Sequence, residues 1–258
     1  MSDRVLSGVA GGVGAIVLNV PDRLNAVDAQ MLAELGAVIG RLAEDPAVRV
    51  LTLTGRGRGF CAGADVSGGV ESDLREVDSA TLYAAGAVTR ALLGSTKPVV
   101  AAVNGVAAGV GVSFALACDY VMATESASFL LAFSRIGLMP DGGATALVAA
   151  SVGRARAMRM ALTAERVPAR VAAEWGLIAE VVADGDFERR RVELLTALAA
   201  GAPLALARTK AAVNAASVDL GGALAREEEG QERLLRSNDF SEGVRAFLTK
   251  EAPRFRGE

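Results

Sequence analysis

The chain has 258 residues, 52% of them apolar and 22% charged, and its formal net charge is −3. This composition is typical of a folded globular protein that is long enough to bury one sizeable core. The weak negative charge and the short, interrupted apolar segments argue against nucleic acid and membrane as partners, and the N-terminus lacks the pattern of a signal peptide.

The first predicted elements are a hairpin and a helix. Residues 4–20 are apolar on either side of Gly11 and Gly12, which predicts a β-hairpin that turns at this pair. Asp28 then stands where its side chain can cap the first turn of a helix. The apolar face of that helix repeats at helical spacing and comprises Met31, Leu32, Leu35, Val38, Ile39 and Leu42.

Buried strands and connecting loops follow. Residues 48–54 and 98–103 are continuous apolar runs, as in strands buried on both faces, and residues 119–129 predict two more short strands. The acidic stretch 71–80 is interpreted as a mobile loop that enters a helix. This repetition of strand, loop and helix predicts an α/β fold with a mainly parallel sheet.

From about residue 143 onward the patterns are helical. Gly or Pro separates segments that are rich in Ala, Leu, Arg and Glu. These segments predict helices at residues 154–163, 186–199, 203–217 and 220–236.

The chain has no histidine, which excludes Ser-His-Asp and Cys-His mechanisms and histidine-ligated metal sites. The G-x-S-x-small pattern at residues 111–115 is therefore not interpreted as a nucleophile elbow. Cys61 and Cys118 are too few for a cysteine-ligated zinc site. They suit reduced thiols, so we expect a cytoplasmic protein.

Two glycine-rich loops, residues 54–65 and 104–119, each follow a predicted buried strand. The carboxyl ends of parallel strands share one edge of a sheet, where ligands bind, and small residues let a ligand approach free N–H groups. Two such loops can direct two backbone donors at one oxygen, as in an oxyanion hole. An ordinary turn is the alternative for either loop alone. Dinucleotide and phosphate-binding loops are disfavoured, because neither sequence completes G-x-G-x-x-G or G-K-[ST].

The chain resembles the crotonase, or enoyl-CoA hydratase/isomerase, superfamily along essentially its whole length. The resemblance rests on "NVPDRLNAVDAQM", on the loop sequences "GRGFCAGADV" and "KPVVAAVNGVAAGVGVSFALACD", and on "RIGLMPDGGAT" and "FLTKEAPRFRGE". It implies a spiral of ββα units that binds an acyl-CoA thioester, with residues 1–195 as the core. Residues 196–258 would form a helical oligomerisation region, and the protein would be a homotrimer or a dimer of trimers.

The resemblance also implies roles for individual residues. The N–H groups of Ala64 and Val110 would donate to the thioester oxygen, and Ala62 would meet the adenine of coenzyme A through its backbone. Asp65, at the border of the coenzyme A site, is expected to cap the following helix rather than touch substrate. The other expected coenzyme A contacts are Arg23, near the phosphates, and Phe247 and Lys250 from a neighbouring subunit. An ordinary surface lysine is the alternative for Lys250.

Two positions depart from the hydratases of the family, which use two glutamates to hold and activate water. Those positions are Ser113 and Phe133 in this sequence, and neither side chain can deprotonate water. Efficient hydration by that route is therefore not expected. Phe133, together with Leu130 and Leu131, is expected to make the pocket apolar and to raise the pKa of a carboxyl group there.

Asp141 is the acid that the resemblance leaves near the reacting carbons. Isomerases that resemble this sequence, including dienoyl-CoA and ring-epoxyphenylacetyl-CoA isomerases, carry Asp at the matching position and use it in proton transfer. The sequence therefore predicts an enoyl-CoA double-bond isomerase-like enzyme without a metal, and with no cofactor besides the coenzyme A of its substrate. A cap for the helix near Gly143 is the alternative role for Asp141. A catalytically silent acyl-CoA-binding carrier is the alternative for the whole protein.

Overall fold

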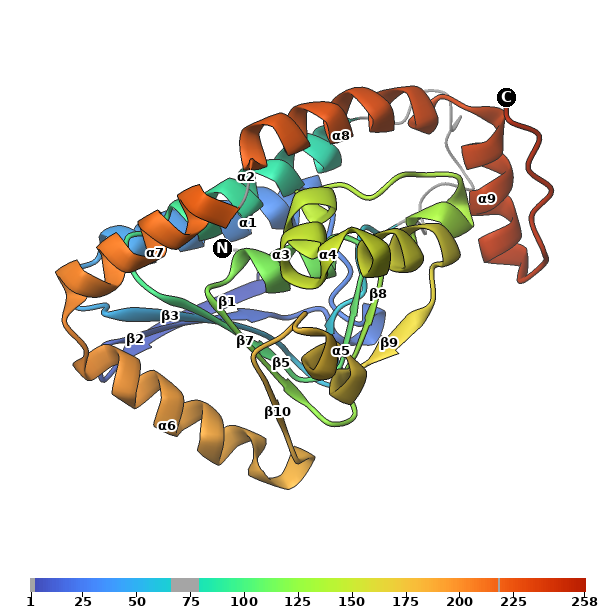
Figure 1. Cartoon of the computed structure of the whole chain (residues 1–258). Coiled ribbons are helices and arrows are strands. Elements are labelled where there is room, and N and C mark those ends of the chain that lie inside the picture. The colour runs from blue at the N-terminus through green and yellow to red at the C-terminus, as the bar shows by residue number, and fades with distance from the viewer. Residues whose placement is uncertain (1–2, 66–78, 218) are drawn as a thin grey trace.

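The protein, in a computed structural model that describes residues 3–65, 79–217 and 219–258, is built around a twisted six-stranded sheet (Figure 1). Its strands lie in the order β1 (Val5–Ala10), β2 (Val13–Leu18), β3 (Val50–Gly55), β5 (Val99–Val103), β7 (Tyr120–Thr124) and β10 (Glu180–Val182). The β1–β2 pair is antiparallel and the other neighbours are parallel. The predicted hairpin is confirmed, with Gly11 and Gly12 at φ angles of 57° and 79°, which favour glycine.

A second, four-stranded sheet consists of short strands. Its order is β4 (Gly59–Cys61), β6 (Val106–Ala108), β8 (Ser128–Leu130) and β9 (Arg166–Pro168). The chain passes from β3 to β4, from β5 to β6 and from β7 to β8, so each turn adds one strand to each sheet before the next helix. This repetition is the expected spiral of ββα units. The three-residue strands were not predicted, because so short a segment shows no period.

Helices cover both faces of the six-stranded sheet. On one face lie α1 (Ala29–Glu44), α2 (Ala80–Gly94) and α3 (Val110–Ala117), and α6 (Phe187–Ala200) lies on the other (Figure 1). Alternate residues of the strands serve the two faces: Leu51 belongs to the main core, whereas Val50 packs in a smaller cluster that includes Phe187 of α6. The predicted cap of α1 is confirmed, since Asp28 Oδ1 accepts from the Met31 N–H at 2.9 Å.

The second half is less purely helical than predicted. Strands β9 and β10 interrupt it, and α4 (Ala144–Thr163) begins well before the predicted segment 154–163. Gly153, at φ 74° and ψ 165°, breaks the helical geometry within α4, which is why the sequence pattern begins after it. The remaining helices are α5 (Ala169–Trp175), α7 (Pro203–Ser217), α8 (Leu220–Leu235) and α9 (Asn238–Thr249).

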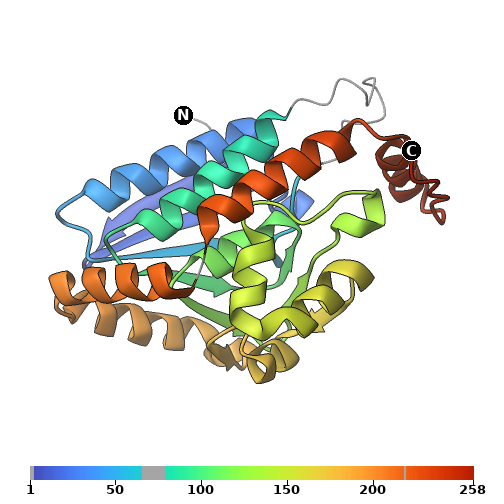
Figure 2. The same cartoon turned by 45° about the horizontal axis from the view of Figure 1, so that its top comes forward.

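Helix α8 lies along α2, and α9 and the C-terminal tail lie at the far end of the molecule (Figure 2). The predicted division after residue 195 falls inside the continuous helix α6, and the division itself stays a prediction. Most of the acidic stretch 71–80 lies outside the described residues, and α2 begins at Ala80.

No single helix in the described parts of the chain is long and apolar enough to cross a membrane. The segments Asp184–Ala200 and Pro203–Ser217 satisfy that length and composition together, but they are bent by 106° relative to each other.

Candidate active site

The two glycine-rich loops meet at Gly63 and Gly109. A Cβ atom built on Gly63 would lie 3.1 Å from the Ala108 carbonyl oxygen, and one built on Gly109 would lie 3.6 Å from the Gly63 Cα. Both glycines have positive φ angles, of 97° and 53°. A larger residue would therefore strain the backbone at both positions, and at Gly63 it would also press on the Ala108 carbonyl. The small residues let two peptide segments from different turns of the spiral touch.

The peptide of Ala64 faces away from its own strand partner. Val27 forms a parallel bridge with Ala64: its N–H donates to the Gly63 carbonyl at 2.9 Å, and its carbonyl accepts from the Asp65 N–H at 2.8 Å. In such a bridge the N–H of the central residue points to the opposite side. Ala64 is also exposed. Its N–H is therefore available to a ligand.

The peptide of Val110 is available for a different reason. Val110 is the first residue of α3, where backbone N–H groups have no partner within the helix. The Gly109 N–H just before it donates to the Leu130 carbonyl at 2.9 Å, which fixes the entry into the helix. The Val110 N–H therefore has no partner within α3. Its donation to the same ligand oxygen as the Ala64 N–H, as in an oxyanion hole, stays a prediction.

Close packing holds α3 against the first loop. A Cβ atom at Gly111 would lie 2.3 Å from the Cys61 carbonyl oxygen, so only glycine allows this approach. Cys61 is completely buried, and burial raises the pKa of its thiol to about 12. Cys61 and Cys118 are both free and buried, as expected of reduced packing residues.

Asp141 lies in the loop before α4, and this loop touches α3. The Ser113 hydroxyl donates to the Asp141 carbonyl oxygen at 2.8 Å. A Cβ atom at the next residue, Gly142, would lie 2.9 Å from Cγ2 of Val110. The loop that carries the predicted acid therefore packs directly on the helix whose first N–H is the predicted donor.

The Asp141 carboxylate does not cap α4, so that alternative is wrong for its side chain. Glu227 of α8 does so instead: its two oxygens accept from the N–H groups of Gly143, at 2.6 Å, and Thr145, at 2.8 Å. The Asp141 Oδ2 atom accepts from Nε2 of Gln231 at 2.8 Å. No described residue donates to the other oxygen, Oδ1.

The electrostatic environment suits Asp141 to proton transfer near neutral pH. Burial raises its pKa to about 7, the hydrogen bond from Gln231 lowers it, and the negative charge of Glu227 raises it further. A carboxyl group with such a pKa can both accept and return a proton at pH 7.

The two positions that depart from the family's hydratases have structural partners here. Ser113 is completely buried and its hydroxyl is engaged by Asp141, while Phe133 is 7% exposed. A Cβ atom on Gly109 would lie 3.8 Å from Cζ of Phe133, so this ring borders the loop before the Val110 donor. Leu130 packs in a small cluster with Ala108 beside that loop.

Arg23, one of the residues expected at the coenzyme A site, already has an acidic partner. Arg23 forms an ion pair with Asp65, and its side chain remains 62% exposed and open to an anionic ligand. The Asp65 carboxylate thus contacts Arg23, and its expected role as a helix cap concerns residues 66 onward, outside the described residues. Ala62 lies on the same loop, and its N–H donates to the Leu24 carbonyl at 3.0 Å.

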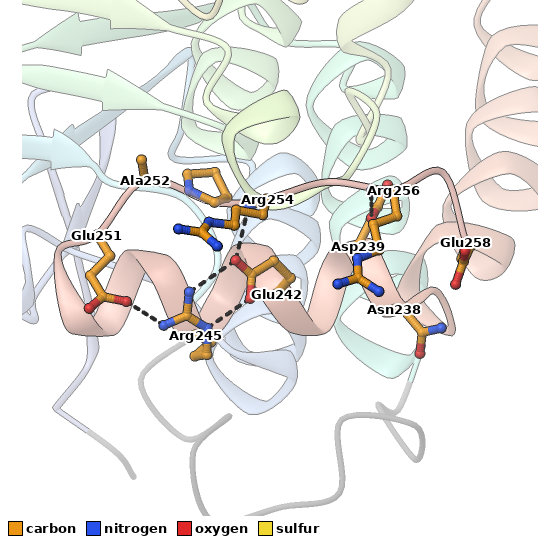
Figure 3. Close-up of a pocket in the computed structure, with 10 residues that line it drawn as sticks. Asn238, Asp239, Glu242, Arg245, Glu251, Ala252, Arg254, Arg256 and Glu258 are labelled. Atoms are coloured by element: carbon orange, nitrogen blue, oxygen red, sulfur yellow. Dashed lines mark hydrogen bonds and ion pairs between the residues drawn. The ribbon is translucent and has the colours of Figure 1, made fainter.

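Phe247 lies on α9 and Lys250 follows its last residue; Figure 3 shows α9 beside the C-terminal tail. Phe247 is 62% exposed, and Lys250 is the exposed left-handed cap of that helix. The cleft between α9 and the tail has a volume of about 630 Å³. Arg245 crosses it to reach Glu242 at 2.7 Å and Glu251 at 2.5 Å. Because these charges already neutralise one another, we assign the cleft no ligand.

Sequence reasoning missed Glu227 and Gln231. Both lie in a run of charged residues that is typical of a solvated helix face, yet each is only 1% exposed. Their spacing of four residues places them on one face of α8. Only the packing of α8 against the Asp141 loop distinguishes them from their exposed neighbours. Among the described residues, no group of three or more Cys, Asp or Glu side chains is arranged to hold a metal ion.

The chain is similar over nearly its whole length to known proteins of one family. The family model for enoyl-CoA hydratase/isomerase matches residues 8–258. The chain is 40% identical to the 1,2-epoxyphenylacetyl-CoA isomerase of Escherichia coli strain K12, with all of both chains covered. It is 43% identical to a probable enoyl-CoA hydratase of Rhodobacter capsulatus, with 96% of each covered.

A solved structure described as an enoyl-CoA hydratase from Mycobacterium avium subsp. paratuberculosis superposes with a TM-score of 0.92 at 42% identity, covering 99% of this chain and all of the other. Relatives named as isomerases and relatives named as hydratases are thus about equally similar to this chain. Their names do not distinguish isomerisation from hydration. That distinction has to come from the residues of the site.

Proposed function

Because the chain belongs to the enoyl-CoA hydratase/isomerase family, we propose that it is an enoyl-CoA double-bond isomerase-like enzyme with Asp141 as its acid–base group. The observation that carries the proposal is the position of Asp141. Its loop packs on α3 through Ser113 and Gly142, and its pKa of about 7 suits proton transfer. The similarity to a relative named 1,2-epoxyphenylacetyl-CoA isomerase supports isomerase chemistry. The substrate in that name belongs to the relative and is not assigned to this chain.

The proposed reaction shifts a double bond without net change in composition. Ionised Asp141 takes a proton from the α carbon of a 3-enoyl thioester. The electron pair of the broken C–H bond forms a double bond to the carbonyl carbon, and the carbonyl π pair moves onto the thioester oxygen. The N–H groups of Ala64 and Val110 stabilise the resulting enolate. Protonated Asp141 then returns the proton to the γ carbon, which gives the 2-enoyl thioester. The step uses no cofactor besides the coenzyme A that the substrate carries.

Hydration requires more than this site provides. A hydratase must hold and deprotonate a water molecule, and Ser113 and Phe133 cannot do so. The Ser113 hydroxyl is already donated to the Asp141 carbonyl at 2.8 Å, which leaves it no free proton for a second acceptor. One carboxyl group is sufficient for the double-bond shift.

The decisive experiment is proton exchange in deuterated water. The α and γ protons of a 3-enoyl-CoA should exchange in the presence of the wild-type protein, as NMR and mass measure directly. Asn matches Asp in size and can still accept from Gln231, but it cannot take a proton. Asp141→Asn should therefore lower the rate roughly 100- to 10,000-fold. Asp184→Asn, at an exposed acid elsewhere, is the matched control and should leave it unchanged.

Exchange that survives Asp141→Asn would remove Asp141 from the mechanism. Tight binding of acyl-CoA without exchange in either protein, across a panel of 2-enoyl, 3-enoyl and dienoyl thioesters, would instead identify a carrier.

We also propose the homotrimer or dimer of trimers that the resemblance implies. Large apolar side chains are exposed on the isolated chain, including Leu162 at 68%, Leu204 at 82% and Val213 at 56%. Exposed apolar side chains of this size are consistent with surfaces that a partner covers. Sedimentation equilibrium measures the mass of the assembly directly, and a monomer at micromolar concentration would contradict the proposal. A cytoplasmic location stays a prediction.

A further inference from the structure

Helix α8 places two buried polar side chains against the Asp141 loop. Glu227 and Gln231 are each 1% exposed, and each takes part in at least two hydrogen bonds. A helix that merely covered this loop would bury apolar side chains, because a buried polar group is costly unless every partner is in place. The two side chains therefore have a role beyond packing.

The orientation of the Gln231 amide is fixed by two partners. Its Oε1 atom accepts from the Met139 N–H at 3.2 Å, so its Nε2 atom must face Asp141, where it donates to Oδ2 at 2.8 Å. An amide does not titrate near neutral pH and can only donate through Nε2. The Oδ2 atom is therefore held as an acceptor whether Asp141 is ionised or protonated.

A glycine allows this arrangement. A Cβ atom at Gly230, next to Gln231, would lie 2.3 Å from the sulfur of Met139. With glycine at this position the Met139 side chain lies directly on α8, which brings its backbone N–H within reach of Gln231. The loop from Met139 to Asp141 is thus seated on α8 at the turn that carries the amide.

We propose that Gln231 is a positioning residue for Asp141, which holds Oδ2 and so makes Oδ1 the atom that takes and returns the proton. This inference rests on the proposed acid–base role of Asp141. Glu227 is the charged group that acts on Asp141 from the same helix. Ser113 of α3 and Thr89 of α2 reach the same loop with neutral hydroxyl groups, at 2.8 and 2.7 Å from its carbonyl oxygens.

The test is the pH at which Asp141 titrates in variants of α8. Gln231→Met keeps the length of the side chain but removes the donor that favours the ionised carboxylate, so the pKa of Asp141 should rise by about one unit. Glu227→Gln removes a negative charge, so the pKa should fall. Glu229→Gln, at an exposed position of the same helix, should change nothing.

Two readouts measure this titration. The exchange rate of a 3-enoyl-CoA should follow the ionised fraction of Asp141, so its pH profile should move to higher pH in Gln231→Met and to lower pH in Glu227→Gln. NMR of ¹³C-labelled aspartate carboxyls measures the same pKa without any turnover, with Asp141→Asn assigning the signal. If Gln231→Met does not fold, Gln231→Glu keeps the shape and places a second carboxyl beside Asp141, which should also raise the pKa.

A purely structural role would lower stability in Gln231→Met and leave both titrations where they are in the wild type, and that result overturns the proposal. The readouts also separate the two hypotheses. A shifted carboxyl titration without any proton exchange would support the positioning of Asp141 by Gln231 but contradict the proposed reaction. Exchange that needs Asp141 but keeps its pH profile in Gln231→Met would support the reaction and contradict the positioning role.

Discussion

Replacing Asp141 by Asn should change how the stability of the protein depends on pH. Folding transfers this carboxyl group from water, where its pKa is 3.8, to a site where burial raises the pKa to about 7. The folded protein therefore binds a proton more tightly than the unfolded chain does. Stability from this group is fully present below pH 3.8 and is lost as the pH rises towards 7. The Asn variant does not titrate and should therefore keep its stability as the pH rises through this range.

The size of the effect follows from the two pKa values. One pKa unit corresponds to about 1.4 kcal/mol, so keeping Asp141 ionised in the folded state costs at most about 4 kcal/mol above neutral pH. Between pH 5 and pH 8 the wild type should lose about 3 kcal/mol through this group alone. The free energy of unfolding of Asp141→Asn, relative to the wild type, should increase by that amount over the same range.

Urea unfolding at pH 5, 6, 7 and 8, at one fixed protein concentration, measures this difference. Other groups titrate in both proteins and cancel. The matched control is Asp184→Asn, because a hydrogen bond from Ser126 lowers the pKa of Asp184. This carboxyl group is therefore ionised in both the folded and the unfolded state from pH 5 to pH 8, and its stability difference should stay constant over that range. A stability difference for Asp141→Asn that is constant from pH 5 to pH 8 would refute the reasoning, since Asp141 would then ionise in the folded protein as it does in water.

Two further predictions concern the chemistry of the site. Val110→Pro removes one proposed oxyanion donor at a helix position that tolerates proline, and it should cost about 3 kcal/mol in transition-state stabilisation, whereas Val110→Ala keeps the donor and should be mild. Steady-state kinetics of the two variants, checked for folding by circular dichroism, measures this, and equal losses would point to the side chain instead. Hydration of crotonyl-CoA, followed by the loss of enoyl absorbance, should be far slower than in a family member with both glutamates. A rate typical of an efficient hydratase would mean that another group holds the water.

The sequence predicted those parts of the fold that are determined by local patterns. Asp28 and the apolar face that follows it indicated α1, and Gly11 with Gly12 indicated the hairpin turn. The short strands of the second sheet could not be predicted, because three residues carry no period and their pairing partners lie far away in the sequence. The first half of α4 was also not predicted, because Gly153 interrupts the helical pattern within the helix.

The site divides in a similar way. The glycine-rich loops and Asp141 could be found from the residues and the family resemblance, since each lies in a distinctive short motif. Glu227 and Gln231 could not, because they lie in a charged helical run and act only through contacts with Gly143, Thr145 and Asp141, which lie 82 to 90 residues earlier in the chain. Partners so distant in sequence leave no mark on local composition.

The hydrogen bond between Ser113 and the Asp141 carbonyl has a consequence for changing the reaction by mutation. Restoring a hydratase glutamate at position 113 would remove the hydroxyl that holds the Asp141 loop and place a charged side chain against it. The acceptor is the main-chain carbonyl of residue 141, so this hydrogen bond is lost with the hydroxyl at position 113 whatever side chain position 141 carries. We therefore expect a substitution at position 113 to shift the loop before α4, and with it the carboxyl group proposed as the acid–base. Introducing water chemistry on the buried face of α3 would then require a compensating change in that loop.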